Sequence, residues 1–312
     1  MTDVVVSVVI PAYNAAAIIA RTLESVRSQT FTAYETIVVD DGSADATSEV
    51  VRSCFAQHGM RGRILRQDNR GMAAARNAGM REAGGEYVAL LDADDLWYPA
   101  KLATVMAEFR QHPEADLVCH DENITRDGRV LRVSHRRLPR GILYDALLFE
   151  GNLLSPSATT LKRGKALEIG GFDERPEYLT VEDYDFWIRF SRHGRIRFLD
   201  RVLGEYVLTE QSASRRVVFH HVALESMLRT HLNAYCASNS TLAARLRARR
   251  RLARVYRSAA RQLIAYREVP RDQRAFVGRM LRTYALEPRN VAVALMWVTV
   301  ATRRLCAAVL RR

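Results

Sequence analysis

The sequence has few cysteines, and none of them is placed for zinc or disulfide chemistry. Cys54, Cys119, Cys236 and Cys306 are far apart, and the 312 residues contain no CxxC pair. Structural zinc sites and disulfide scaffolds depend on closely spaced cysteines, so this spacing argues against both. Reduced thiols are typical of a cytoplasm. Because the N-terminus also lacks the basic start and the cleavage site of a signal peptide, we expect a cytoplasmic protein.

Long apolar runs are lacking as well. The apolar stretch at residues 291–301 extends over only 11 residues, and Arg303 and Arg304 then interrupt the pattern. A membrane-spanning helix needs about 20 apolar residues, so we predict no transmembrane segment. With 48% hydrophobic and 26% charged residues, the composition suits one large soluble domain, or one domain with an appendage.

Negative charge is scarce in the C-terminal part of the chain. Residues 215–312 contain 21 arginines, no lysine and four acidic residues. This surplus of 17 positive charges leaves a net charge of −5 for residues 1–214, within a total of +12. Such asymmetry predicts two parts with different tasks. We place an α/β domain at residues 1–214 and an arginine-rich, all-helical appendage at residues 215–312.

The first 120 residues alternate between apolar, β-branched runs and segments with helical spacing. Strands are predicted at residues 4–10, 36–39, 64–65, 87–91 and 115–119, and helices near residues 18–26, 44–56, 72–82 and 99–111. This alternation predicts a mostly parallel central sheet flanked by helices. Residues 125–206 are more irregular, with a further helix expected at 180–191.

Three of the predicted strands end in polar or small residues. These ends are residues 11–14, 40–43 and 92–95. In open α/β sheets ligands bind outside the carboxyl ends of the strands, so three such ends on one rim predict a binding site. The carboxylates of Asp92, Asp94 and Asp95 repel one another unless a cation lies between them. A divalent ion with oxygen ligands and a phosphate-bearing ligand fits, and the alternative is an acidic turn that caps the next helix.

Five short motifs in this order resemble the family 2 glycosyltransferases, which have the Rossmann-like GT-A fold. The motifs are VVIPAYN at residues 8–14, VDDGS at 39–43, LDADD at 91–95, GGFD at 170–173 and EDYD at 182–185. The resemblance covers about residues 5 to 214. It implies transfer of a sugar from a nucleotide-diphosphate donor, expected to be UDP-linked, to a hydroxyl of a glycan or lipid-linked saccharide. The family also implies inversion, a divalent cation (Mn²⁺ or Mg²⁺) and a place in polysaccharide or cell-envelope synthesis.

The resemblance also implies roles for individual residues. Positions around the nucleotide are Pro11, Tyr13, Asn14 and Asp41, the DxD element is Asp92, Ala93 and Asp94, and Asp94 or Asp95 reaches the metal. The general base that takes the proton of the acceptor hydroxyl is Asp183. A cation would neutralise the charge that develops on the departing diphosphate.

Other residues near these motifs have two possible roles. Arg76 could contact the diphosphate or form a structural salt bridge. Glu182 and Asp185 are rivals of Asp183 and candidates for the acceptor side, although acids in a first helical turn also favour the helix dipole. We expect Trp97 to face the acceptor, and Phe186 and Trp187 to lie in the core. Residues 120–123 are expected to form a solvated loop rather than a border of the acceptor pocket.

The sequence departs from the family in one element. Many relatives have Tyr-Arg-x-His after the last strand, whereas Thr209 stands here in place of the histidine. A non-catalytic nucleotide-sugar-binding relative that acts as a partner or scaffold protein therefore stays an alternative. The QxxRW motif and the long spans of processive synthases are absent, which favours single addition. A nucleotidyltransferase would need a glycine-rich, arginine-containing loop after the first strand, and residues 11–14 are not such a loop.

The arginine-rich appendage has three interpretations. One face of its central helix contains Arg247, Arg250, Arg254, Arg257 and Arg261. This face could be solvated while the helix packs on the catalytic domain, or it could adsorb to an anionic membrane at the inner face of the cell. Nucleic-acid binding ranks last, because no nucleic-acid module accompanies the charge.

Overall fold

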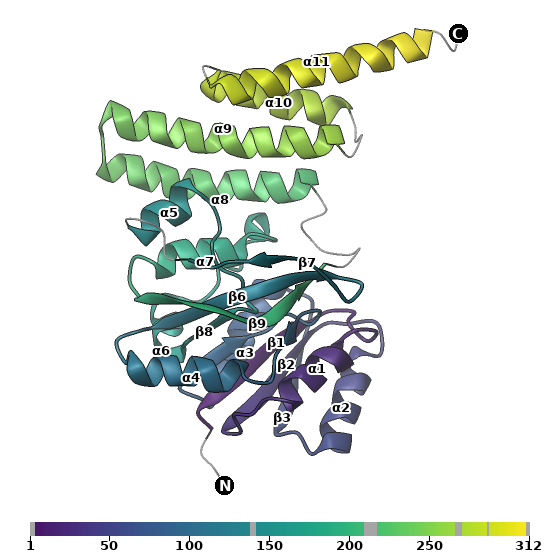
Figure 1. Ribbon diagram of the computed structural model, residues 1–312, viewed down its shortest axis with the longest axis vertical. Coiled ribbons are helices and arrows are strands. Elements are labelled where there is room, and N and C mark those ends of the chain that lie inside the picture. Colours follow the sequence, from purple (N-terminus) through teal and green to yellow (C-terminus); the bar gives the residue numbers. More distant parts are fainter. Residues whose placement is uncertain (1–3, 138–141, 209–216, 266–269, 286, 310–312) are drawn as a thin grey trace. The chain divides into compact units, whose positions relative to one another are not determined.

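Figure 1 shows the computed structural model, which describes residues 4–137, 142–208, 217–265, 270–285 and 287–309. The chain divides into two compact units. The α/β unit comprises Met1–Leu147 and Gly151–Ser212, and the helical unit comprises Leu148–Glu150 and Ala213–Arg312. Thr209 and the boundary expected between residues 214 and 215 lie outside the described residues.

The α/β unit is built on one central sheet. Its strands are β1 (Val6–Ala12), β2 (Tyr34–Asp41), β3 (Gly62–Gln67), β4 (Tyr87–Leu90), β5 (Leu96–Trp97), β6 (Leu117–Arg126), β7 (Arg129–Ser134), β8 (Thr159–Lys162) and β9 (Ile196–Val207). The order is β3-β2-β1-β4-β8-β6-β9-β5, and β7 pairs with β6. Strands β3, β2, β1 and β4 are mutually parallel, whereas β8 runs antiparallel to both β4 and β6. The parallel half therefore brings the carboxyl ends of β1, β2 and β4 to one edge.

Helices flank this sheet, which confirms the predicted α/β class (Figure 1). The helices of residues 4–190 are α1 (Ile19–Arg27), α2 (Thr47–His58), α3 (Met72–Glu82), α4 (Lys101–Gln111), α5 (Leu143–Phe149), α6 (Arg163–Glu168), the 3₁₀ helix η1 (Pro176–Tyr178) and α7 (Glu182–Phe190), and those that contact strands include α1, α2, α3, α4 and α6. Every residue of β1 is buried, as expected of a strand covered on both faces. Helix α3 lies close to this strand because Gly79 has no side chain, and a methyl group there would collide with Val9.

An aromatic cluster anchors α7 in the core. Phe172 stacks on Phe186 with ring centroids 4.3 Å apart, and Trp187 meets Phe186 edge to face at 5.1 Å. Both Phe186 and Trp187 are fully buried, which confirms their predicted place in the core. Aromatic pairs of this geometry stabilise beyond the area that they bury. The start of α7, with its three acidic residues, is therefore held in a defined position.

The prediction of a solvated loop at residues 120–123 is wrong. These residues belong to β6, and His120, Asp121 and Glu122 are buried. Strand β6 is longer than its apolar core because β7 and β9 pair with its second half on either side. The polar side chains are tolerated because they find partners, as when Arg136 donates to Glu122 Oε2 at 3.0 Å.

The helical unit consists of long helices, as the appendage was predicted to do. They are α8 (Val217–Ser238), α9 (Leu242–Ala265), α10 (Pro270–Tyr284) and α11 (Pro288–Val309). The apolar stripe of α9, which includes Val255 and Leu263, is buried. Tyr256 on the same stripe donates a hydrogen bond to Glu225 of α8 at 2.7 Å. Among the described helices, none has the combination of length and hydropathy that a membrane crossing requires.

Candidate active site

The loops after β1 and β2 are joined through Asn14. Its backbone N–H donates to Ser43 Oγ at 3.0 Å, and its side-chain oxygen accepts from the Ala44 N–H at 2.9 Å. Asn14 has a positive φ of 48°, a conformation that asparagine tolerates better than most residues. Pro11 is buried in β1, whereas Tyr13 is 53% exposed at the rim. The structure thus brings two of the predicted strand ends together and leaves the Tyr13 ring accessible.

Asp41, at the end of β2, holds the loop that leads into α3. Its Oδ1 accepts from the Gln67 side chain at 2.7 Å and from the Arg70 N–H at 2.9 Å, and its Oδ2 accepts from the Gly71 N–H at 2.8 Å. The carboxylate is buried beneath these donors. In this structure its contacts therefore order the rim, and three of its acceptor positions are already used.

A hollow of about 630 Å³ adjoins Asp41 at the same rim. It is lined by Gly42, Arg66, Gln67, Asp68 and Asn69. Residues 66–69 were not among the predicted site residues, which came from the ends of three other strands. Their position in the sequence was the available signal, since residues 66–69 lie at the end of β3 and just after it, and β3 is another parallel strand of the same edge.

The carboxylates of the acidic turn after β4 make different contacts. Asp95 is buried, and its two oxygens accept from the Val207 N–H at 2.9 Å and from the Ser157 hydroxyl at 2.5 Å. Ser157 Oγ also accepts from the Asp92 N–H at 3.0 Å. Burial and the nearby carboxylates of Asp94 and Asp92 raise the pKa of Asp95 well above its usual range. Asp95 therefore braces the turn, which makes it a poor candidate for the metal ligand.

Asp94 is the acid of this turn that fits a cation. Among the described residues, no side chain donates a hydrogen bond to its carboxylate. Burial and the neighbouring Asp92 raise the pKa of Asp94 to about 6. A hard divalent cation prefers carboxylate oxygens and would relieve this repulsion, so the donor set of Asp94 and Asp92 suits Mn²⁺ or Mg²⁺. The carbonyl of Ala93, between them, accepts from Thr22 Oγ1 of α1 at 2.7 Å.

Arg76 connects this turn to α7. The guanidinium lies 2.7 Å from Asp92 Oδ1 and 2.9 Å from Glu182 Oε1, and its side chain is 2% exposed. It also lies over the Phe172 ring, 5.4 Å from the centroid. Of the two roles predicted for Arg76, the structure shows the buried salt bridge. Breaking such a pair leaves a buried charge without compensation, so Arg76 keeps two distant acidic segments side by side.

Asp183 stands next to this bridge at the start of α7. Its Oδ1 accepts from the Tyr184 N–H at 2.7 Å, and its Oδ2 accepts from the Asn152 side chain at 3.1 Å. Burial and the negative charge of Glu182 raise the pKa of Asp183 to about 7, although Arg76 acts in the opposite direction. A carboxylate with a pKa near the working pH is suited to accept a proton.

The rivals of Asp183 are engaged in salt bridges. Glu182 is buried against Arg76, and Asp185 is buried and pairs with Arg189 Nε at 2.7 Å. Asp183 is the least buried of the three acids. Thr180, just before α7, has a positive φ of 78°, which is unusual for a β-branched residue and often marks a functional segment.

Trp97 does not face an acceptor, contrary to the prediction. The side chain is 3% exposed and belongs to the main core. Its indole N–H donates to the Ser157 carbonyl at 2.7 Å, and Lys101 Nζ lies 3.6 Å from the ring centroid. The tryptophan therefore stabilises the acidic turn indirectly, because it binds Ser157, the residue that also contacts Asp92 and Asp95.

Tyr206 is a half-buried residue near the end of β9. Burial and the carboxylates of Asp95, Asp92, Asp94 and Asp183 raise the pKa of its hydroxyl. Tyr206 was not among the predicted site residues, because it belongs to the element that departs from the family pattern.

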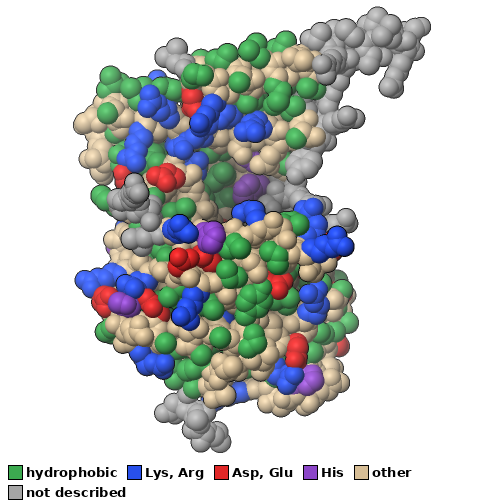
Figure 2. Space-filling view, in the orientation of Figure 1, with side chains coloured by type: hydrophobic (Ala, Val, Ile, Leu, Met, Phe, Trp, Pro, Cys, Tyr) green, Lys and Arg blue, Asp and Glu red, His purple; other side chains and the backbone are tan. Residues whose placement is uncertain are grey.

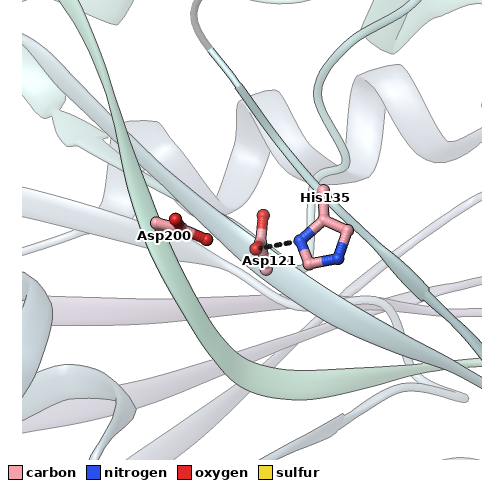
Figure 3. A group of neighbouring side chains, drawn as sticks. All are labelled: Asp121, His135 and Asp200. Carbon is pink, nitrogen blue, oxygen red and sulfur yellow. Dashed lines mark hydrogen bonds and ion pairs between the residues drawn. The ribbon is translucent and has the colours of Figure 1, made fainter.

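A second group of possible metal ligands lies elsewhere in the same sheet (Figure 3). Asp121 of β6, His135 after β7 and Asp200 of β9 each offer a ligand atom, and these atoms lie within 4.8 Å of one another. His135 Nδ1 is 2.8 Å from Asp121 Oδ2, and the Arg136 N–H donates to the other oxygen. These contacts also fasten the segment after β7 to β6, which is a sufficient structural role. Sequence reasoning missed the group because an irregular β6–β9 register brings Asp200 into place.

The family described as Glycosyl transferase family 2 matches residues 7–169, more than half of the chain. The amylovoran biosynthesis glycosyltransferase AmsB of Erwinia amylovora is 36% identical over 203 residues, which are 62% of this chain and 66% of that protein. The chondroitin synthase of Escherichia coli is 29% identical over 67% of this chain and only 30% of its own length. The chain thus matches less than two thirds of the length of these curated relatives.

Solved structures support the fold. S. aureus TarS 1-349 in complex with UDP-GlcNAc has a TM-score of 0.58 and 18% identity, with 90% of this chain and 89% of that chain covered. The mannosyltransferase PcManGT from Pyrobaculum calidifontis, in complex with GDP-Man and Mn²⁺, has a TM-score of 0.57 and 19% identity over 96% of this chain and 86% of its own. Such identities establish a shared fold.

Proposed function

The chain belongs to glycosyl transferase family 2, and from this premise we propose that it transfers a hexosyl group from a nucleotide-diphosphate sugar to an acceptor hydroxyl with inversion. The observation that carries the proposal is the Arg76 bridge. One buried guanidinium contacts Asp92 of the acidic turn and Glu182, the neighbour of Asp183. Donor-side and acceptor-side carboxylates, 90 residues apart in the chain, thereby belong to one site.

The rim of β1, β2 and β3 is proposed to bind the donor nucleotide. Tyr13 offers an exposed ring, and the hollow at Arg66 and Asn69 lies beside the ordered Asp41 loop. TarS is recorded with UDP-GlcNAc and PcManGT with GDP-Man, so this fold accepts both nucleotides in relatives. We propose UDP as the nucleotide of this chain, with Pro11, Asn14 and Asp41 shaping its pocket.

A divalent cation, when bound, would supply positive charge for the diphosphate, and Asp94 with Asp92 would hold it. PcManGT is recorded with Mn²⁺, which agrees with this donor set. The protein's own groups keep this end of the site in order. Asp95 and Ser157 hold the turn, and Arg76 balances part of the charge of Asp92.

Asp183 is the proposed general base. Its Oδ2 takes the proton of the acceptor hydroxyl as that oxygen attacks the anomeric carbon from the side opposite the leaving diphosphate. One displacement on the opposite face inverts the configuration, so no second carboxylate nucleophile is needed. Asn152 donates to Oδ2 and orients the carboxylate. The raised pKa makes Asp183 a better proton acceptor than an ordinary aspartate.

The acceptor is proposed to be a growing glycan or a lipid-linked saccharide. The Erwinia relative is named for amylovoran biosynthesis, which places at least one relative in polysaccharide synthesis. We propose a related role in the cell envelope for this chain. Its arginine-rich helical unit suits work in the cytoplasm at the inner face of the membrane, where lipid-linked acceptors are found.

The test is donor turnover by the purified full-length protein. Incubation with UDP-, GDP- and TDP-sugars and a simple glycan acceptor should release nucleotide only when Mn²⁺ or Mg²⁺ is present. Asp183→Asn should keep donor affinity and lose transfer by about 10²- to 10⁴-fold, since it removes the proton acceptor. NMR of the product should show an inverted anomeric centre.

The matched control is Asp185→Asn, the same change two residues away. It removes the partner of Arg189, so it should lower thermal stability while the folded protein still transfers sugar. Normal transfer by Asp183→Asn would refute the base assignment. Donor binding without turnover on any acceptor would instead favour a non-catalytic nucleotide-sugar-binding protein.

A further inference from the structure

The hairpin of β6 and β7 has three exposed arginines near its turn. Arg126 is the last residue of β6, and Arg129 and Arg132 belong to β7. Among the described residues, none forms an ion pair or a hydrogen bond with their guanidinium groups. Figure 2 shows Lys and Arg side chains gathered at this end of the hairpin, at the right of the view. This part of the α/β unit therefore presents positive charge to solvent without a compensating acid.

The strand register places the three arginines on one face, which we call the arginine face. Arg126 is the cross-strand partner of Arg129, and Arg132 is the partner of Ile124. Cross-strand partners share a face, and so do alternate residues of one strand. Residues three apart on a regular strand point to opposite faces. Here the register shifts at Leu131, and this bulge turns Arg132 to the same side as Arg129.

The arrangement is unfavourable for the hairpin by itself. Like charges directly opposite each other on paired strands destabilise a sheet, and Arg126 and Arg129 are such a pair. Asp127, in the turn between them, forms no salt bridge with a described residue. A bound anion would remove this repulsion, because guanidinium groups pair with carboxylates through parallel hydrogen bonds. The pair therefore fits an anionic ligand better than it fits a purely structural role.

Neighbouring strands connect the hairpin to the acidic turn. Val130 of β7 pairs with Thr125 of β6, and Thr125 pairs with Val207 of β9. The Val207 N–H donates to Asp95 at 2.9 Å. Paired strands lie about 4.8 Å apart, so Val130 is two strand spacings, about 10 Å, from the backbone that binds Asp95. The arginines therefore lie close to the proposed donor side of the active site.

The arginine face is also connected to the proposed general base. Glu122 lies on this face, because it precedes Arg126 by four residues in the same strand. The Ser155 hydroxyl donates to Glu122 Oε1 at 3.3 Å. Three residues earlier, the Asn152 side chain donates to Asp183 Oδ2 at 3.1 Å. The short segment 152–155 thus contacts both the arginine face and Asp183.

We propose that the arginine face binds an acceptor glycan that carries carboxylate groups, and holds it beside Asp183. The inference rests on the proposed function and deepens it, since it names the class of acceptor for the same site. The unpaired guanidinium groups favour an acidic glycan over a neutral one. A membrane or a nucleic acid would match the charge, but neither accounts for the connections from this face to Asp95 and Asp183.

The test measures glycan binding by the full-length protein in calorimetry. An oligogalacturonate of about six units should bind about tenfold or more tightly than a neutral malto-oligosaccharide of the same length, and salt should weaken its binding. Arg129→Gln and Arg132→Gln should each weaken binding of the acidic glycan by about three- to fivefold. Arg129→Lys should show a smaller loss, because lysine keeps the charge without the paired hydrogen bonds.

The matched control is Arg110→Gln in the last turn of α4. Arg110 is exposed and, among the described residues, has no ion pair. It should bind the acidic glycan within about twofold of the parent protein. Equal losses for Arg110→Gln and Arg129→Gln would overturn the site in favour of general charge attraction. Equal binding of the acidic and neutral glycans, or tighter binding to phosphatidylglycerol vesicles or duplex DNA, would overturn the acceptor class.

Donor turnover by the same preparations separates this site from the proposed function. Arg129→Gln should bind nucleotide sugars like the parent protein, because β7 lies outside the proposed donor rim of β1, β2 and β3. Arginine-dependent glycan binding by a protein that turns over no donor would leave the glycan site standing and overturn the transferase proposal. Sugar transfer to neutral acceptors without any preference for the acidic glycan would have the opposite meaning.

Discussion

Asp183 shows how neighbouring charges set the chemistry of one carboxylate. Burial and Glu182 raise its pKa to about 7. A general base must be ionised to act, so kcat/KM should rise about tenfold per pH unit below pH 7 and level off above it. A profile measured from pH 5.5 to 8.5 at saturating Mn²⁺ checks this. A flat profile over that range would contradict the base assignment.

The same shift has a consequence for stability that does not depend on activity. An aspartate in the unfolded chain has a pKa of about 3.9, so the folded state binds this proton more tightly. Binding of this proton therefore stabilises the folded state fully below pH 4, and that stabilisation is lost as the pH rises to about 7. Asp183→Asn should be more stable than the parent protein at pH 8, by about 1 to 3 kcal/mol, and similar at pH 4.5. Chemical denaturation at both pH values measures the difference.

Asp94 and Asp95 are neighbours with different expected phenotypes. Asp94→Ala should abolish metal-dependent donor binding with little change in stability, because its carboxylate braces no described side chain. Asp95→Ala should lower stability by about 2 to 4 kcal/mol, since the Val207 N–H and the Ser157 hydroxyl lose a buried acceptor. Thermal melts with donor titrations distinguish the two. If Asp95→Ala stays stable but loses the metal, Asp95 rather than Asp94 is the metal ligand.

At the scale of elements, the close contact between α3 and the sheet positions the site. Helix α3 carries Arg76 and Asn77. The Asn77 side chain donates to the Phe172 carbonyl and accepts from the Phe172 N–H, each at 2.8 Å. Gly171 has a φ of 66°, and a methyl group there would come within 2.5 Å of Asn77 Oδ1. Gly171 therefore lets the segment before α7 lie against α3.

A substitution at Gly79 tests how closely α3 packs against the sheet. Gly79→Ala should destabilise the protein by about 1 to 3 kcal/mol, because the added methyl group meets Val9 and Val39. Gly164 of α6 is the control, since its added methyl group would have no atom within 4 Å. Gly164→Ala should be neutral or stabilising by up to about 1 kcal/mol. Denaturant midpoints give both values, and equal effects would show that α3 can move away from the sheet.

At the scale of the whole molecule, the net positive charge is confined to one part, although basic residues occur in both. Residues 215–312 hold the surplus of 17 charges while the rest of the chain is slightly acidic. Like charges on α9 repel and oppose folding of the helical unit, and salt screens this repulsion within about 10 Å. An increase from 20 to 300 mM NaCl should raise the melting temperature of the helices by about 2 to 5 °C.

Far-ultraviolet circular dichroism measures this salt response. Arg249→Gln removes one exposed charge of α9 and should reduce the slope. A melting temperature that falls with added salt would mean that ion pairs dominate instead. Pairs such as Arg257 with Glu287 and Arg279 with Glu225 would then outweigh the repulsion.

Local patterns in the sequence determined the architecture of this protein. The alternation of strands and helices, the acidic turn after β4, the core position of Phe186 and Trp187, and the arginine-rich helices are all written in short stretches of the chain. Side-chain period and composition depend on near neighbours, so they can be read before any tertiary contact is known. Ordered motifs then identified the family that the comparisons confirm.

Only the tertiary structure decided which contacts each polar residue makes and how deeply it is buried. Arg76 meets Glu182 across 106 residues of chain, Asp95 accepts hydrogen bonds from Ser157 and Val207, and Trp97 lies in the core rather than at an acceptor. Buried Glu122 likewise depends on Arg136 as its partner. The charge, burial and pKa of a polar side chain depend on partners that approach only when the chain folds. The candidate carboxylates could therefore be identified from the sequence, whereas the surroundings of each carboxylate depend on the fold.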